Sequence, residues 1–169
     1  MNDILKIKLV ATDVDGVLTN GRIYHDFSGQ QIKIFSIKDG LAFRMLKIIG
    51  MKSAIVSGKK VGFAKARFID FGVDFIFEDV EDKLSVIKKI CVESGCLMDE
   101  VFFIGDDILD IPLLKEVGFS AAPLDAVEEV KNIVKYITKS IGGNGAFREC
   151  VEIILKGQGK WERALENLF

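Results

Sequence analysis

The sequence predicts an α/β fold with three layers: a parallel sheet with helices on both of its faces. Short runs rich in Val, Ile and Phe alternate along the chain with longer stretches of helical period. The short runs are apolar throughout, which is typical of strands that are covered on both faces. With 169 residues, 49% of them hydrophobic, the chain can bury a full core, so we expect one domain over residues 1–169.

Each element is predicted by its period and by the residues that bound it. The strands are expected at 8–12, 52–56, 74–77, 101–104, 119–121 and 136–137. The helices are expected at 41–49, 61–71, 83–94, 111–117, 126–133 and 146–155. Residues 22–37 break the alternation, because period-two patterning flanks Ser28-Gly29, and predict a β-hairpin inserted after the first strand. The tail over 157–169 is either a docking helix or a frayed end.

Composition excludes several classes of function. The net charge of −2 is spread over mixed signs and leaves no basic footprint for nucleic acid. No apolar run approaches the roughly 20 residues of a membrane span. The first residues lack the pattern of a signal peptide, so we expect a cytoplasmic protein. The three cysteines are too few and too unevenly spaced for a disulfide framework or a zinc site.

Polar residues stand where the predicted strands end. Asp13–Asp15, Ser57-Gly58 and Gly105–Asp107 each follow an apolar run, and Lys83 starts a helix after the strand that ends at Phe77. Because the carboxyl ends of parallel strands lie along one edge of a sheet, the four segments converge on one crevice.

The residue types in this crevice indicate phosphoryl transfer. Several carboxylates at one place repel one another unless a cation lies among them, and Mg²⁺ prefers carboxylates, waters and a substrate phosphate. Lys83, the Ser57 hydroxyl and the backbone N–H groups around Gly58 suit a phosphate dianion. Asp13 is then the natural nucleophile, and Asp15 is placed to protonate the leaving oxygen and later activate water.

In this order, the Asp13-x-Asp15-Gly-Val-x-Thr motif, Ser57-Gly58, Lys83 and Gly105-Asp106-Asp107 resemble the haloacid dehalogenase (HAD) superfamily. The resemblance implies a Rossmann-like fold in which Asp13 is the nucleophile and Asp15 the acid/base. It also implies that Mg²⁺ is bound by Asp13, by Asp106 and by the backbone carbonyl of Asp15, and that Ser57 and Lys83 hold the phosphate. Asp107 and Asp110 would lie in the outer shell.

The chain resembles one family of this superfamily that lacks a cap domain. Only the hairpin and one helix separate Asp15 from Ser57, and about one helix and one strand separate Ser57 from Lys83, so neither gap holds a domain of ordinary size. Further segments resemble the 3-deoxy-D-manno-octulosonate 8-phosphate (KDO 8-phosphate) phosphatases: residues 35–40, 57–60, 67, 105–112 and 142–149.

This second resemblance implies the substrate, the assembly and the pathway. The enzyme would be a homotetramer in which a neighbouring subunit helps close the site, acting in lipopolysaccharide biosynthesis. Asp15, Gly58 and Lys83 would contact the substrate at its phosphate end. The positions that match those near the sugar acid are Lys38, Asp39, Gly40, Arg44, Lys59 and Arg67.

Some alternatives remain open. The family often has Arg where this chain has Lys59, and Arg is common at the position of Asn144, which leaves room for a related nonulosonate 9-phosphate as substrate. The glycines of 142–145 either belong to the family signature or form a flexible linker before the last helix. A non-catalytic binding or regulatory subunit on the same fold is the alternative of a different class.

Overall fold

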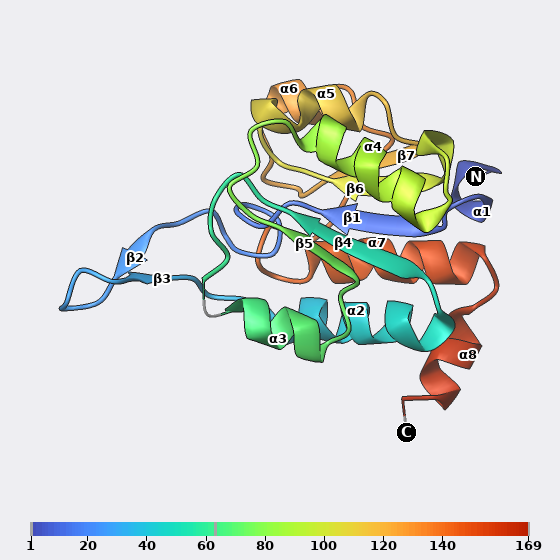
Figure 1. Ribbon diagram of the computed structural model, residues 1–169, viewed down its shortest axis with the longest axis horizontal. Helices are drawn as coiled ribbons and strands as arrows, with labels where there is room; N and C mark the ends of the chain where they lie inside the picture. Colours follow the sequence, from blue (N-terminus) through green and yellow to red (C-terminus); the bar gives the residue numbers. More distant parts are fainter. Residues whose placement is uncertain (1, 63, 169) are drawn as a thin grey trace.

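The centre of the molecule is a parallel sheet of six strands. The computed structural model describes residues 2–62 and 64–168. The strand order is β5-β4-β1-β6-β7-β8, and all neighbours are parallel (Figure 1). The strands are β1 (Leu9–Thr12), β4 (Lys52–Val56), β5 (Phe75–Phe77), β6 (Val101–Ile104), β7 (Phe119–Ala122) and β8 (Tyr136–Ile137). The chain runs outward from β1 in both directions, as in a doubly wound fold, so the predicted fold class is confirmed.

Helices cover both faces of the sheet, as Figure 1 shows. On one face lie α4 (Lys83–Ser94), α5 (Ile111–Leu114) and α6 (Glu128–Lys131). On the other lie α2 (Ile37–Ile49), α3 (Ala64–Asp70), α7 (Ala146–Gly157) and α8 (Trp161–Glu166). Outside the hairpin, three short pieces complete the described elements: α1 (Asn2–Leu5) and the 3₁₀ turns η1 (Met98–Glu100) and η2 (Ile108–Asp110).

The sheet separates two hydrophobic cores. On one face, Phe43 of α2 and Phe147 of α7 are fully buried and stack with their ring centroids 4.4 Å apart. On the opposite face, Ile87 and Leu113 pack over Phe103 of β6. Because both faces are covered, the central strands consist of buried apolar residues rather than alternating ones.

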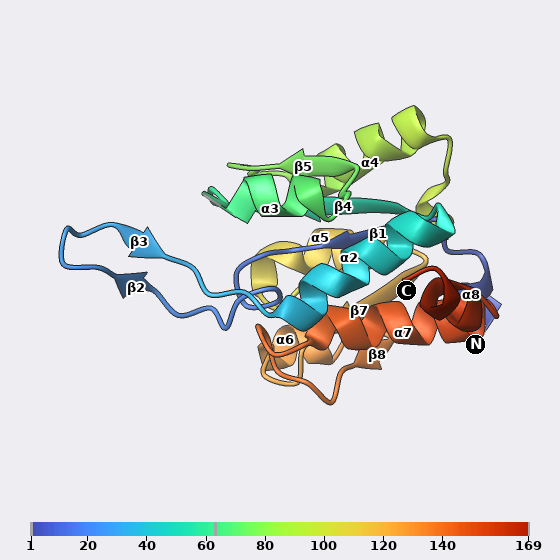
Figure 2. The ribbon, with the colours of Figure 1, turned by 90° about the horizontal axis from the view of Figure 1, so that it is seen from below.

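The predicted hairpin forms and projects from the layered body (Figure 2). Its strands, β2 (Tyr24–His25) and β3 (Gln31–Ile32), pair with each other and not with the main sheet. The turn is held by Asp26, whose Oδ1 accepts hydrogen bonds from the backbone N–H groups of Ser28 and Gln30 at 2.8 and 2.9 Å. The hairpin therefore lies beside the carboxyl edge of the sheet with little packing of its own.

Several element boundaries differ from those predicted. The helix expected at 41–49 begins at Ile37, because Ser36 caps it by accepting a hydrogen bond from the N–H of Lys38. The helices expected at 61–71, 111–117 and 126–133 are shorter than their apolar patterns. Residue 63, within the first of these, and residue 169 of the tail lie outside the described residues. The rest of the tail forms α8, which packs on α2 and fully buries Ala164, so its docking-helix interpretation is correct.

Short connections leave the carboxyl edge open. Among the described residues, only the hairpin and α2 lie between β1 and β4, and only α3 lies between β4 and β5, so the expectation of a fold without a cap is confirmed. None of the described helices has the length and apolar character that crossing a bilayer requires.

The stacked pair Phe43–Phe147 yields a stability prediction. We expect Phe147→Ala to lower the free energy of unfolding by about 3–5 kcal/mol, because it leaves a cavity between α2 and α7. Urea unfolding followed by circular dichroism measures the change. The control Val92→Ala removes an exposed side chain of α4 and should shift the value by less than about 0.5 kcal/mol. Equal losses in the two variants would contradict the packing described.

Candidate functional site

The functional side chains gather where the three central strands end. Asp13 directly follows β1, Ser57 directly follows β4, and Asp106 follows β6 after one glycine. Because β4 and β6 flank β1 in the sheet, the order of the strands brings these three segments side by side. The fourth segment belongs to a helix and not to the sheet. Lys83 is the first residue of α4 and directly follows Asp82, which caps that helix.

Lys83 joins two buried carboxylates. Its Nζ lies 3.0 Å from Oδ1 of Asp13 and 2.6 Å from Oδ1 of Asp110, and all three side chains are about 90% buried or more. Burial lowers the pKa of Lys83, but the charges of Asp13 and Asp110 raise it by more, so that it stays above its ordinary value. The ammonium therefore holds the nucleophile candidate in a fixed position.

Asp110 lies within the cluster itself, and not outside it as the resemblance implies. Besides contacting Lys83, its second oxygen accepts a hydrogen bond from the backbone N–H of Asp106 at 3.1 Å. It thereby fixes the loop that carries Asp106. Its sequence signal is weak, because an aspartate inside a short helical turn is most often a cap.

Three carboxylates share this place with one ammonium. One oxygen each from Asp13, Asp106 and Asp110 lie within 4.8 Å of one another. Burial, and then the charge of Asp110, raises the pKa of Asp13 to about 6. Burial, and then the charges of Asp13 and Asp110, raise the pKa of Asp106 to about 8. The cluster is thus short of positive charge.

One oxygen of this cluster lacks a partner. Oδ1 of Asp106 is buried and has no hydrogen-bond partner among residues 2–62 and 64–168. An orphaned carboxylate oxygen in a buried, electron-rich site is costly unless a cation satisfies it. Oxygen donors of this kind suit Mg²⁺ or a similar hard ion, so the residues present fit the predicted metal.

Glycines allow the loops to approach closely. A Cβ on Gly16 would lie 1.8 Å from Oδ2 of Asp106, and the φ of Gly16 is +85°. Behind Gly16, a Cβ on Gly142 would lie 1.9 Å from the Gly16 carbonyl oxygen, and Gly143 donates its N–H to the carbonyl of Val17 at 2.8 Å. The glycine-rich segment is thus a packed support for the loop after Asp13, and its interpretation as a flexible linker is wrong.

A cleft of about 550 Å³ lies above the cluster, and three of the predicted catalytic residues line it: Asp13, Asp15 and Lys83. Ser57 is fully buried, and its Oγ accepts a hydrogen bond from the N–H of Lys59 at 3.2 Å. The cleft is lined by Asp13, Asp15, Gly58, Lys59, Lys83, Asp106, Asp107 and Asp110, together with neighbouring loop residues.

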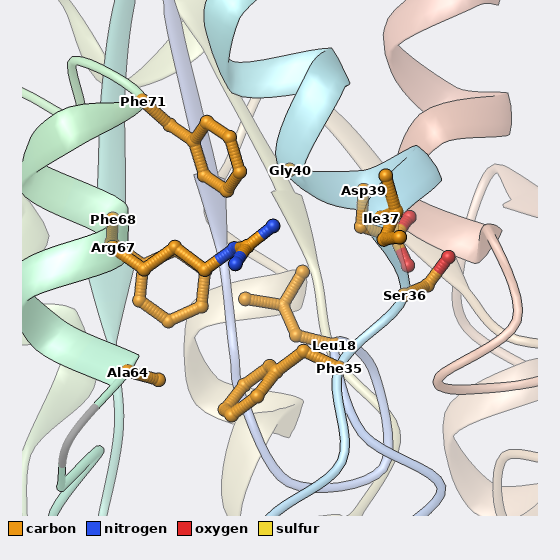
Figure 3. A pocket seen from close by; sticks show the side chains of 10 residues that line it. All are labelled: Leu18, Phe35, Ser36, Ile37, Asp39, Gly40, Ala64, Arg67, Phe68 and Phe71. Atoms are coloured by element: carbon orange, nitrogen blue, oxygen red, sulfur yellow. The ribbon is translucent and has the colours of Figure 1, made fainter.

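Three of the predicted sugar-acid residues line a different cavity. Figure 3 shows it between α2 and α3, with the guanidinium of Arg67 pointing inward 5.2 Å from the centre of the Phe71 ring. Asp39 and Gly40 line it as well, and its volume is about 290 Å³. However, the carboxylate of Asp39 accepts backbone N–H groups of Gly145 and Arg148 at 3.2 and 2.8 Å, so it ties α2 to the start of α7.

The other two sugar-acid residues lie outside both cavities. Lys38 and Arg44 are exposed on α2 and line neither the cleft nor the cavity in Figure 3. A further cation, which is not among the predicted site residues, contacts a residue of the cleft: Nζ of Lys33 lies 2.7 Å from Oδ2 of Asp15. Lys33 was not identifiable from sequence because only the course of the hairpin brings it there.

The charge imbalance yields a prediction for metal binding. We expect Mg²⁺ to raise the melting temperature, by an amount equivalent to about 2.7 kcal/mol when its concentration is a hundred times Kd. Because the raised pKa values of Asp13 (about 6) and Asp106 (about 8) let protons compete with the ion, the gain should be large at pH 8.5 and small at pH 5.5. Scanning fluorimetry with and without Mg²⁺ at both pH values measures it.

A matched pair of variants makes this prediction specific. Asp106→Asn removes the orphaned carboxylate and should abolish the gain from Mg²⁺, whereas Asp99→Asn removes an exposed carboxylate paired with Lys6 and should leave it unchanged. A full Mg²⁺ response in Asp106→Asn would show that the cluster is not the metal site.

The chain is similar to known phosphatases along most of its length. A family model described as haloacid dehalogenase-like hydrolase matches residues 68–149. The 3-deoxy-D-manno-octulosonate 8-phosphate phosphatase KdsC of Haemophilus influenzae is 38% identical over 154 residues, which cover 91% of this chain and 86% of that protein. KdsC of Escherichia coli K12 is 32% identical over 158 residues, which cover 94% of this chain and 84% of that protein.

Solved structures share the fold over nearly the whole chain. The 3-deoxy-D-manno-octulosonate 8-phosphate phosphatase of Moraxella catarrhalis, in complex with magnesium, phosphate and KDO, matches with a TM-score of 0.94 at 32% identity, covering 99% of this chain and 97% of its own. The cobalt-bound Haemophilus influenzae enzyme matches with a TM-score of 0.90 at 34% identity, covering 97% of this chain and 99% of its own. The chain therefore belongs to the haloacid dehalogenase-like hydrolases and, within them, to the family of the KDO 8-phosphate phosphatases.

Proposed function

We propose that this protein is a Mg²⁺-dependent phosphatase that hydrolyses KDO 8-phosphate to KDO and inorganic phosphate. The observation that carries the proposal is the buried cluster of Asp13, Asp106, Asp110 and Lys83, with its orphaned oxygen, beneath an open cleft. The relative from Moraxella catarrhalis, whose structure contains magnesium, phosphate and KDO, supports the choice of substrate.

In the first step, Asp13 attacks phosphorus. Lys83 holds Oδ1 of Asp13, which leaves Oδ2 to form the new oxygen–phosphorus bond while the bond from phosphorus to the sugar oxygen breaks. The departing oxygen takes a proton from Asp15. The products of this step are the free sugar acid and an aspartyl-phosphate on Asp13.

In the second step, water hydrolyses the aspartyl-phosphate. Asp15, now a carboxylate, accepts a proton from the attacking water, and the phosphorus–oxygen bond to Asp13 breaks to regenerate the free enzyme. Asp13, Asp106 and the backbone carbonyl of Asp15 would hold Mg²⁺. When bound, this ion supplies positive charge that offsets the carboxylates and the phosphate.

The phosphate would be held by donors around Lys83. Its ammonium, the N–H of Gly58 and the hydroxyl of Ser57 are the proposed contacts. Because Oγ of Ser57 already accepts a hydrogen bond from the N–H of Lys59, its own hydrogen is available to a phosphate oxygen.

A cationic cavity beside the cleft supports an anionic substrate group in addition to phosphate. It measures about 440 Å³ and shares Asp15, Gly21 and Lys59 with the cleft. Beside the Lys33–Asp15 pair, three further cations line it, Arg22, Lys59 and Lys60, against one further acid, Asp79. The carboxylate of a sugar acid fits this balance. Contacts from Lys38, Asp39, Gly40, Arg44 and Arg67 to the sugar acid stay predictions.

We further propose that the chain, a single domain, assembles as a homotetramer in the cytoplasm and serves lipopolysaccharide biosynthesis. The hairpin exposes a set of apolar side chains that suit an interface better than water: Ile23, Phe27, Ile32 and Ile34, with Ile37 just beyond. Without a cap, the open cleft would be closed by a neighbouring subunit.

Loss of the nucleophile tests the reaction. We expect Asp13→Asn to reduce phosphate release from KDO 8-phosphate by on the order of 10³-fold or more, because no other group replaces the attacking oxygen. A nonulosonate 9-phosphate assayed in parallel should be the poorer substrate by kcat/KM. Activity of Asp13→Asn equal to that of the wild type would refute the aspartyl-phosphate mechanism. A wild type that releases no phosphate from any sugar phosphate would favour a non-catalytic subunit.

Sedimentation velocity tests the assembly. The wild type should sediment as a tetramer of the 18.8 kDa chain, and Phe27→Asp should sediment as a smaller species because it puts a charge on the tip of the hairpin. Val92→Asp, which changes an exposed valine of α4, should leave the tetramer intact. A monomeric wild type would rule out a neighbouring subunit as part of the site.

A further inference from the structure

Lys33 contacts the residue proposed as the acid/base. Its Nζ lies 2.7 Å from Oδ2 of Asp15, with the Lys33 side chain 12% exposed and that of Asp15 40% exposed. Lys33 follows β3, on the return strand of the hairpin, so this cation reaches Asp15 from outside the main sheet. Among the ion pairs of the described residues, only Lys83 is a more buried cation.

The burial of the Lys33 side chain distinguishes this contact from an ordinary surface ion pair. The Lys52–Asp74 pair has the same length, 2.7 Å, but its lysine is 53% exposed, and it lies at the opposite end of β4 from the cleft. Ordering a long lysine side chain costs conformational entropy, and an exposed pair contributes little in return. A lysine that is both ordered and buried against a carboxylate restricts the orientation of that carboxylate.

The contact uses one of the two oxygens of Asp15. Oδ2 accepts the hydrogen bond from Lys33, whereas Oδ1 has no hydrogen-bond partner among the described residues. A carboxylic acid that carries its proton on Oδ1 still accepts a hydrogen bond on Oδ2. The same contact is therefore compatible with Asp15 as a proton donor and as a proton acceptor.

We propose that Lys33 is a positioning residue for Asp15, and this inference rests on the proposed phosphatase function. The ammonium fixes Oδ2 so that Oδ1 faces the reacting oxygen atoms. In the first step, the proton on Oδ1 passes to the sugar oxygen as its bond to phosphorus breaks. In the second, Oδ1 takes a proton from the attacking water, and the ammonium of Lys33 keeps all its protons in both steps.

Leaving groups of different basicity separate this role from substrate binding. A sugar alkoxide needs a proton as it departs, whereas the phenolate of p-nitrophenyl phosphate departs without one. The value of kcat/KM reports the steps up to this departure. Loss of correct acid positioning should therefore lower kcat/KM for the sugar phosphate far more than for the aryl phosphate.

The experiment compares Lys33→Met, Lys33→Arg and the control Lys52→Met with the wild type on KDO 8-phosphate and p-nitrophenyl phosphate. For Lys33→Met, we expect kcat/KM on the sugar phosphate to fall about 10- to 100-fold, with KM changed less than about twofold. On the aryl phosphate, the fall should stay below about threefold. Lys33→Arg should recover most of the activity, and Lys52→Met should match the wild type.

A double variant and a melting curve separate an effect through Asp15 from an effect on the fold. If Lys33 acts through Asp15, adding Lys33→Met to Asp15→Asn should lower the activity no further. Thermal unfolding of Lys33→Met should resemble that of Lys52→Met, which excludes a general loss of fold.

Several outcomes would overturn the inference while leaving the proposed function intact. The first is an equal fall of kcat/KM on both substrates in Lys33→Met. The second is a rise in KM alone, which would make Lys33 a substrate-binding residue. The third is a gain in activity, which would mean that the Lys33–Asp15 pair inhibits the enzyme. A wild type that hydrolyses neither ester would instead overturn the proposed function and this inference with it.

Discussion

The site depends on one buried interaction, the ammonium of Lys83 held between the carboxylates of Asp13 and Asp110. A buried ion pair is stable only when its charges and hydrogen bonds are matched. Here the match is incomplete, since Asp106 brings a third carboxylate and one oxygen without a partner among the described residues. The protein thus keeps a local excess of negative charge, which a divalent cation can offset. The same group of charges fixes the proposed nucleophile and creates the need for a cation.

This arrangement requires loops to pack more closely than side chains permit. Gly16 lies between the carboxylate of Asp106 on one side and the backbone of Gly142 on the other. The segment before α7 therefore supports the loop after Asp13, although it lies far away in the sequence. Asp39 extends the support by accepting hydrogen bonds from the first residues of α7. Residues that resemble a substrate signature can thus act on the site through its backbone.

The hairpin carries both exposed apolar residues and a residue that contacts the site. It carries exposed apolar side chains that suit assembly and, on its return strand, the lysine that contacts Asp15. Packing of the hairpin against neighbouring subunits would also restrict Lys33. In an enzyme without a cap, the same insertion can then supply both the closure of the cleft and the orientation of the proposed acid/base group.

By itself, the sequence determined the sheet, its helices and the reaction class. Apolar runs give the strands directly, and residues that follow parallel strands must meet at one edge, so Asp13, Lys83 and Asp106 were predictable as a group. Only the tertiary structure decided the partners of these residues: Asp110 for Lys83, Lys33 for Asp15, and the N–H groups of α7 for Asp39. It also placed Arg67 in a separate cavity. The physical reason is that local patterns specify which face of an element is buried, whereas contacts between distant side chains depend on how loops and a projecting hairpin close around the edge of the sheet.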